Sequence, residues 1–142
     1  MGNPTVKIAF DTNILIYFLE DIEPQATEIE KILAAIMKGQ NRGVVSTISI
    51  AEVLTGFYQA GNDAKALKTK RLLGDLTLSG LEIVPVTFEI ADLAANLRAK
   101  NGGTLPDGLI VATAINQEAN MIYSQYKDMK RFNKEIKVCE LP

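Results

Sequence analysis

Val6-Lys7-Ile8-Ala9-Phe10-Asp11-Thr12-Asn13 is an apolar stretch that ends abruptly in a carboxylate, a hydroxyl and an amide. Its apolar part, rich in residues that favour strands, is typical of a buried β-strand. A second apolar run, Ile14 to Leu19, follows without a loop. In open α/β folds, ligands bind outside the carboxyl ends of the strands. Asp11 therefore either caps the next helix or forms one wall of a site.

Strand and helix patterns alternate along the rest of the chain. Further strands are predicted at 43–46, 81–86, 121–124 and 137–141, and helices at 24–39, 50–57, 62–78, 88–100 and 105–119. This alternation predicts an α/β protein, a single-domain α/β/α sandwich over residues 1–142 with a central, mainly parallel sheet of four to five strands. Pro85 favours an end or edge position for its strand. The helix at 105–119 is apolar on nearly every side, so we expect it to be buried.

The composition limits both the class of protein and its location. The 142 residues, 47% of them hydrophobic and 23% charged, suffice for one domain with a substantial core. No apolar run approaches the ~18 residues of a membrane span, and no signal-peptide leader precedes Val6. Cys139 is the only cysteine, so no disulfide forms within the chain. We expect a cytoplasmic protein without membrane contact.

The chain contains no histidine, and its formal net charge is −2. The absence of histidine excludes catalysis by a histidine base, as in Ser-His-Asp hydrolases. It also removes the commonest ligand of transition metals. The slightly acidic balance argues against a general polyanion binder, so any contact with nucleic acid must come from local basic patches. Chemistry here has to rest on carboxylates, hydroxyls, amides and lysines.

Four acidic residues are candidates for that chemistry, and each also has a structural interpretation. Asp11 could cap the helix that follows the first strand. Ser49-Ile50-Ala51-Glu52 matches a capping box, in which the glutamate reaches back to the cap residue. Thr104-Leu105-Pro106-Asp107 is the same device with aspartate, favoured by the helix dipole by roughly 0.3–1 kcal/mol. Asp128 lies in a mixed-charge segment where a solvated surface acid is the ordinary expectation.

The four acids taken together suggest a metal site. Asp11, Glu52 and Asp128 each follow a predicted strand, so a parallel sheet could bring them to one edge. Carboxylates ~5 Å apart repel each other by about 3 kcal/mol per pair at an effective dielectric near 20. A cluster of three or four therefore needs protons or a divalent cation to offset the repulsion. Oxygen ligands alone point to Mg²⁺ or Mn²⁺.

Three segments of the chain resemble, in order and spacing, the signature segments of the PIN domain family. They are Phe10-Asp11-Thr12-Asn13-Ile14-Leu15, Ser46-Thr47-Ile48-Ser49-Ile50-Ala51-Glu52-Val53 and Leu105-Pro106-Asp107-Gly108-Leu109-Ile110-Val111-Ala112-Thr113-Ala114. The resemblance spans nearly the whole chain and is closest to the VapC-type toxins of toxin–antitoxin pairs. It implies a metal-dependent endoribonuclease, in which metal-activated water attacks an RNA phosphodiester.

The resemblance also assigns roles to individual residues. It implies that Asp11, Glu52 and Asp107 hold one or two Mg²⁺ or Mn²⁺ ions. Thr12, Asn13 and Ser124 match polar positions that line the site in the family, and we interpret them as supporting the ligands or contacting phosphate. An RNA substrate, an antitoxin protein and a homodimer are the partners implied.

The segment after the fourth strand departs from the family pattern. The family often reads Thr-Asn-Asp-x-Asp-Phe there, whereas this chain has Ser124-Gln125-Tyr126-Lys127-Asp128-Met129. Tyr126 occupies the place of an Asn or Asp, so the role of fourth acid, as metal ligand and catalytic residue, falls to Asp128. The same departure motivates an alternative, a non-catalytic PIN-like module that binds a protein partner.

A second alternative is an aspartyl-phosphate phosphatase of the haloacid dehalogenase type. Asp11 after a strand fits its nucleophile, but Asn13 stands where that family has its second aspartate. Two basic faces are candidate RNA contacts or simply solvated helix surfaces: Lys65-Lys68-Arg71 and Lys127-Lys130-Arg131-Lys134.

Overall fold

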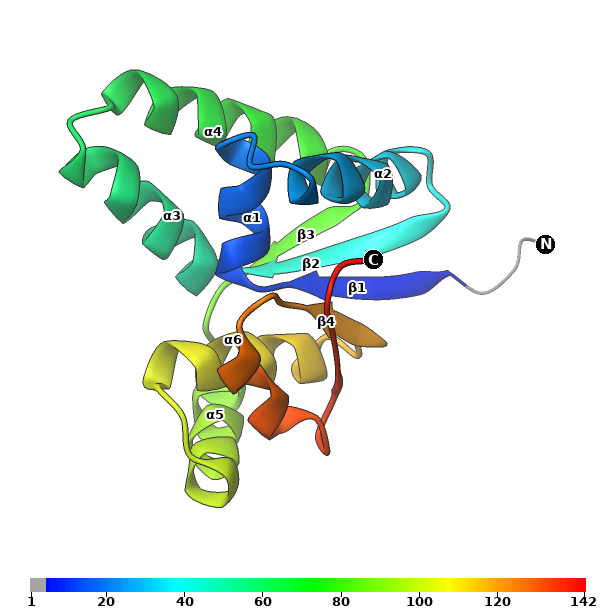
Figure 1. Ribbon diagram of the computed structural model, residues 1–142. Helices are drawn as coiled ribbons and strands as arrows, with labels where there is room; N and C mark the ends of the chain where they lie inside the picture. Colours follow the sequence, from blue (N-terminus) through cyan, green and yellow to red (C-terminus); the bar gives the residue numbers. More distant parts are fainter. Residues whose placement is uncertain (1–4) are drawn as a thin grey trace.

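The computed structural model describes residues 5–142 as a sheet with a helical layer on each face (Figure 1). The strands are β1 (Val6–Phe10), β2 (Asn41–Ser46), β3 (Leu81–Val84), β4 (Met121–Tyr123) and β5 (Lys137–Cys139). The helices are α1 (Thr12–Leu19), α2 (Gln25–Met37), α3 (Thr47–Gln59), α4 (Asp63–Thr77), α5 (Phe88–Asn101) and α6 (Leu105–Asn116), with a 3-10 helix, η1, at Lys127–Phe132. The predicted single-domain α/β sandwich is confirmed.

All five strands are parallel and follow the order β3-β2-β1-β4-β5. The sheet is thus at the upper limit of the predicted four to five strands. The chain moves from β1 to β2 and β3 on one side and later returns to place β4 on the other side of β1. This reversal makes the β1–β4 boundary the topological switch point, where open α/β sheets form their ligand crevice.

The core consists of two clusters, one on each face of the sheet, because successive strand side chains point to opposite faces. Ile8 and Phe10 of β1 pack with residues of α1 to α4. Ala9, between them, packs with residues of α5, α6 and η1. In Figure 1 these two helical layers lie above and below the sheet. Gly43 of β2 leaves room for the first layer, since a Cβ there would lie 2.8 Å from Leu81 Cδ1.

Most element boundaries agree with the sequence predictions to within a few residues. Pro85 lies just outside β3, which is an edge strand, as its position predicted. α6 is buried as expected but ends at Asn116. The predicted strand at 137–141 is shorter, ending at Cys139. None of the helices in residues 5–142 is both long and apolar enough to cross a membrane.

The capping box predicted at Ser49-Ile50-Ala51-Glu52 is wrong. The helix begins three residues earlier, at Thr47, directly after β2 and without a loop. Its cap is Ser46, whose side chain accepts a hydrogen bond from Ile48 N at 3.1 Å. Ser49 is fully buried in the first turn, so its side chain is free for a different role, described below.

Candidate metal and nucleic-acid site

Asp11 is the centre of a hydrogen-bonded group at the carboxyl end of β1. It is the N-cap of α1, and its Oδ1 accepts the backbone N–H of Thr12 at 2.7 Å. Its Oδ2 accepts from the Ser124 hydroxyl at 2.7 Å and from the Asn13 amide at 3.0 Å. Asp11 is therefore the helix cap that the sequence offered as one of two interpretations, and the same carboxylate is also bonded to Ser124 and Asn13.

Burial and neighbouring charge act on this carboxylate in the same direction. Asp11 is only 3% exposed. Burial is the main reason why its pKa is raised above the usual value, and the charges of Asp107 and Glu52 raise the pKa further. The hydrogen bonds from Ser124 and Thr12 oppose the shift without cancelling it. The fold thus holds an acid whose negative charge is under-compensated by its protein surroundings.

Glu52 reaches the same edge from the second turn of α3. Its Oε1 accepts the Thr12 hydroxyl at 2.6 Å, and the Ser49 hydroxyl lies 3.0 Å from the same Thr12 oxygen. Ser49 is a member of the group that sequence reasoning missed, because it was assigned to a cap. Its position three residues before Glu52 was the available signal, since residues at that spacing share one face of a helix.

Asp107 lies in the first turn of α6, half-buried, with its backbone N–H donated to the cap residue Thr104 at 3.2 Å. The predicted cap at Thr104 is therefore confirmed. The pKa of Asp107 is raised, chiefly by burial and also by the charges of Glu52 and Asp128; Thr104 and Arg131 oppose the rise. These mutual effects place Asp11, Glu52 and Asp107 in one electrostatic neighbourhood.

Asp128 occupies η1 rather than an open loop, and its side chain is exposed. Its Oδ2 accepts the Tyr126 hydroxyl at 2.7 Å. Its charge raises the pKa of Asp107, whereas the charges that raise the pKa of Asp11 are those of Asp107 and Glu52. Asp128 therefore lies at the margin of the acidic group, with its carboxylate already engaged by a phenol.

Asn13 and Ser124 join the ends of β1 and β4 across the switch point. The Asn13 amide donates to Asp11 and to Ser124 Oγ at 3.2 Å, while its carbonyl accepts the backbone N–H of Gln125 at 3.0 Å. Ser124 Oγ, 1% exposed, also accepts Tyr126 N at 3.1 Å. Both N–H donors of the Asn13 amide are used within the protein, one of them on Asp11, so the amide orients that carboxylate.

Carboxylate oxygens are the type of ligand that a hard divalent ion prefers, although the side chains do not already surround a metal position. Within residues 5–142, no three Asp, Glu or Cys side chains lie close enough to enclose a metal ion as they stand. Three hydrogen bonds occupy three of the roughly four acceptor positions of the Asp11 carboxylate. One position on Oδ1 is left for a ligand, and Mg²⁺ commonly binds through one or two carboxylates while keeping several waters.

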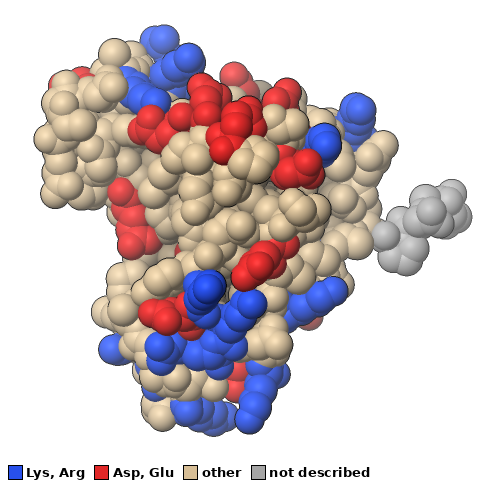
Figure 2. Space-filling model, in the orientation of Figure 1, with Lys and Arg blue, Asp and Glu red and all other residues tan. Residues whose placement is uncertain are grey.

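The surface charge differs between the two helical layers. Figure 2 shows acidic side chains along the upper layer of this face and a concentration of Lys and Arg over the lower one. Of the predicted basic face on η1, Arg131 donates to the backbone oxygens of Asp128 and Asn101, and Lys130 pairs with Glu140 at 3.2 Å. Lys127 and Lys134 are exposed and form no ion pair within the described part of the chain.

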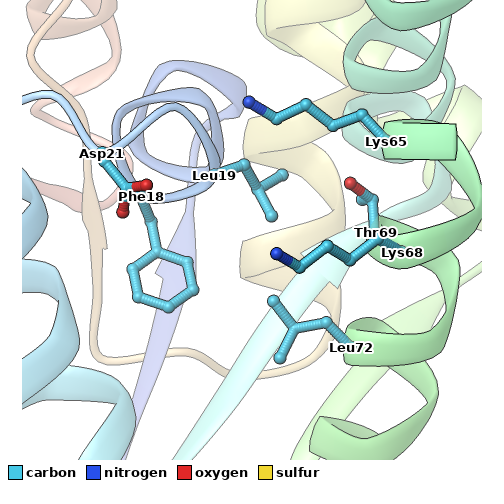
Figure 3. Close-up of a pocket in the computed structure, with 7 residues that line it drawn as sticks. All are labelled: Phe18, Leu19, Asp21, Lys65, Lys68, Thr69 and Leu72. Carbon is cyan, nitrogen blue, oxygen red and sulfur yellow. The ribbon is translucent and has the colours of Figure 1, made fainter. Parts of the chain in front are cut away.

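A separate pocket lies between the end of α1 and α4 (Figure 3). Its lining combines apolar side chains with two lysines and one acid: Phe18, Leu19, Asp21, Lys65, Lys68, Thr69 and Leu72. None of the candidate acids lines it. Lys65 belongs to the other predicted basic face, Lys65-Lys68-Arg71. Its Nζ pairs with Glu20 at 2.7 Å and lies 5.5 Å from the centre of the Phe57 ring.

The hydrogen bonds of the buried Ser124 hydroxyl lead to a prediction about stability. Replacing Ser124 with alanine removes one of the two donors to Asp11 Oδ2 and the acceptor of Tyr126 N, so partly buried polar groups lose a hydrogen-bond partner. We expect a loss of about 1–3 kcal/mol in the free energy of unfolding, measured by urea denaturation. Ser79→Ala, at a partly exposed serine, is the matched control. An equal loss in both variants would contradict the network's role.

The fold and the site together define a class: a parallel α/β protein with carboxylates gathered at the switch point of its sheet. The sequence model of the PIN domain family matches residues 8–135 of this chain. Because the match covers most of the chain, this protein belongs to the PIN domain family.

Several solved toxin–antitoxin structures share the fold. A toxin–antitoxin complex from Klebsiella pneumoniae is 24% identical with a TM-score of 0.70, covering 93% of this chain and 95% of that one. The DNA-bound VapBC of Salmonella typhimurium is 16% identical with a TM-score of 0.73, covering 96% and 98%. Mycobacterium tuberculosis VapC20, described as a toxin cleaving the sarcin–ricin loop, is 13% identical with a TM-score of 0.67, covering 87% and 92%. No curated protein matches the sequence significantly.

Proposed function

We propose that this protein is a metal-dependent endoribonuclease of the VapC toxin type, which hydrolyses RNA phosphodiester bonds. The observation that carries the proposal is the convergence of Asp11, Glu52 and Asp107 at the switch point of the sheet, with mutual charge effects that raise the pKa of two of them. The family match and the toxin neighbours support the same activity.

In this proposal Asp11, Glu52 and Asp107 hold Mg²⁺ or Mn²⁺, with Asp128 as a fourth, outer acid. A divalent ion bound there would activate a water for attack on the phosphodiester and stabilise the leaving oxygen. Asn13 and Ser124 fix the orientation of the Asp11 carboxylate. Thr12 holds Glu52 toward the same edge through its hydroxyl. Such hydrogen-bonded supports typically change metal affinity or activity by 10–100-fold when removed.

The charge distribution suggests where the RNA backbone lies. Acidic side chains alone would repel a polyanion, so attraction has to come from nearby cations. Lys127 begins η1, the element that also carries Asp128, and Lys134 lies two residues beyond its end. We therefore assign the phosphate contacts to these two lysines rather than to Lys130 and Arg131, which are engaged within the protein.

The geometry of the site gives no support to the alternative of an aspartyl-phosphate phosphatase. An Asp11 nucleophile would have to use the one open position on Oδ1, because Oδ2 accepts two hydrogen bonds and Oδ1 accepts one. Asn13 stands in place of the second aspartate, and its amide is bonded to Asp11, Ser124 and Gln125.

A protein partner and self-association are the remaining parts of the proposal. Several structural neighbours are toxin–antitoxin or VapBC complexes, and two of the VapBC structures contain DNA. By analogy we propose an antitoxin, encoded beside this protein, that suppresses the nuclease, and a homodimer of the toxin. Gel filtration of the two co-expressed proteins, against this protein alone, measures both associations.

The activity itself is tested with purified protein and structured RNA. We expect cleavage in millimolar Mg²⁺ or Mn²⁺, no cleavage in excess chelator, and recovery when the metal is restored. Sequencing of the new RNA ends locates internal cuts. A protein that is folded, binds no Mn²⁺ in calorimetry and leaves the RNA intact would instead be the non-catalytic module.

A further inference from the structure

A pocket of about 240 Å³ opens beside the acidic group at the β1–β4 boundary. It is lined by Asn13 and Tyr17 of α1 and by Gln125 and Tyr126 of the segment after β4. Asn13 connects it directly to the site, since the Asn13 amide donates to Asp11 Oδ2 at 3.0 Å. Asn13 and Tyr17 are four residues apart on one helix, so their side chains lie on the same face.

Tyr126 is one of the two aromatic residues that line this pocket. The side chain is 46% exposed, and its hydroxyl donates to Asp128 at 2.7 Å. The bond ties the ring to the acid that neighbours Asp107, so an exposed aromatic surface is held at a defined place next to the carboxylates. An exposed, fixed ring beside an open pocket is the arrangement on which single-stranded nucleic-acid binders stack bases.

The pocket lining also includes a side-chain amide, that of Gln125, whose oxygen is already bonded. Gln125 Oε1 accepts the backbone N–H of Leu141 at 2.6 Å, which fixes the amide so that Nε2 is the group left to donate. The Tyr17 hydroxyl forms no hydrogen bond to another residue within 5–142. Lining residues therefore offer a ring face, an amide donor and a phenol, the groups with which proteins bind unstacked bases of RNA.

The size and charge of the pocket limit the kinds of ligand that can bind in it. Its volume is below the roughly 300–1,000 Å³ of pockets that enclose drug-sized ligands, so it suits a single flat ring system. No Lys or Arg lines it, and acids stand beside it, which disfavours a phosphate or carboxylate. A neutral nucleobase fits both conditions.

We propose that the pocket of Asn13, Tyr17, Gln125 and Tyr126 receives one base of the RNA next to the cleaved phosphate, stacked on the Tyr126 ring. This inference rests on the proposed ribonuclease function and adds a base-binding position to it. It also gives Tyr126, which departs from the family pattern, a role particular to this chain: the ring selects where the RNA lies relative to the carboxylates.

The test measures RNA binding separately from cleavage. Short single-stranded RNAs carry the fluorescent base 2-aminopurine at each position in turn, and the protein background is Asp107→Asn so that the RNA stays intact. One position is expected to show strong quenching on binding, because stacking on an aromatic ring quenches 2-aminopurine. Tyr126→Ala should abolish that quenching and weaken binding about tenfold or more. Tyr126→Phe, which keeps the ring, should retain both signals.

Tyr58→Ala is the matched control, since Tyr58 is similarly exposed, at 49%, but lies on α3 outside the pocket. Thermal melting verifies that each variant is folded. If the background protein binds RNA but Tyr126→Ala binds and quenches equally well, the base pocket is wrong while the nuclease proposal stands, and a cationic side chain of a protein partner becomes the better occupant. If the background protein and the wild type bind no RNA, both proposals fail together.

Discussion

Replacing Asp107 with asparagine is expected to reduce metal-dependent RNA cleavage by about a hundredfold or more, because loss of even a supporting group around a metal costs 10–100-fold. Asparagine preserves the size of the side chain and the backbone N–H that Thr104 caps. The change therefore removes a negative charge from the acidic group without removing the start of α6. Initial rates at saturating Mn²⁺, with single-turnover conditions, measure the effect.

Asp63→Asn provides the control for this substitution. Asp63 also lies in the first turn of a helix, α4, but is exposed. Both variants lose the favourable charge at a helix N-terminus, worth about 0.3–1 kcal/mol, so only Asp107→Asn should lose activity. Equal rates for wild type, Asp107→Asn and Asp63→Asn would show that Asp107 takes no part in the reaction.

The sequence predicted the α/β layers and the parallel sheet because these depend on local patterns. The apolar run before Asp11 and the all-apolar helix that Asp107 opens are legible from residue types alone. The edge position of β3 followed from Pro85. Such features are decided within a few consecutive residues, so no knowledge of the tertiary contacts was needed.

The hydrogen bonds that connect the residues of the candidate site could not be predicted in the same way. The bond from Ser124 to Asp11 spans 113 positions of sequence, and Thr12 meets Ser49 and Glu52 only after α1 and α3 have packed. The misplaced cap at Ser49 has the same origin. Ser46 and Ser49 are both acceptable caps by local rules, and the sheet decides between them, because β2 continues to Ser46.

The resemblance to the PIN family supplied a hypothesis for the metal ligands, but not the arrangement of the residues around Asp128. Asp128 was expected as a fourth acid, and the structure places it in η1 with its carboxylate bonded to the Tyr126 hydroxyl. Tyr126, noted in the sequence only as a departure, becomes the wall of the pocket beside Asp11. Exposed aromatic residues carry no local pattern that separates a solvated side chain from one that lines a pocket.

The stability of the metal-free protein should rise as the pH is lowered from neutral. The folded-state pKa values of Asp11 and Asp107 are raised, mainly by burial, so the folded protein binds these two protons at a higher pH than the unfolded chain does. Stability therefore increases as pH falls through the folded pKa values toward the ordinary aspartate value of 3.8. The difference in melting temperature between wild type and Asp107→Asn, followed with pH, isolates the contribution of Asp107.

A divalent ion is expected to bind the carboxylates of Asp11 and Asp107, whose pKa values burial raises. Added Mn²⁺ is expected to stabilise the wild type at pH 7 by about 2.7 kcal/mol at a concentration a hundred times its Kd. At pH 5 the gain should shrink, since protons compete with the metal for the carboxylates. Asp107→Asn should lose most of the gain, whereas NaCl at equal ionic strength should not reproduce it. The negative charge of Asp11 and Asp107 is what would attract a cation to this edge of the sheet. An equal shift in melting temperature for wild type and Asp107→Asn would therefore mean that Mn²⁺ binds elsewhere.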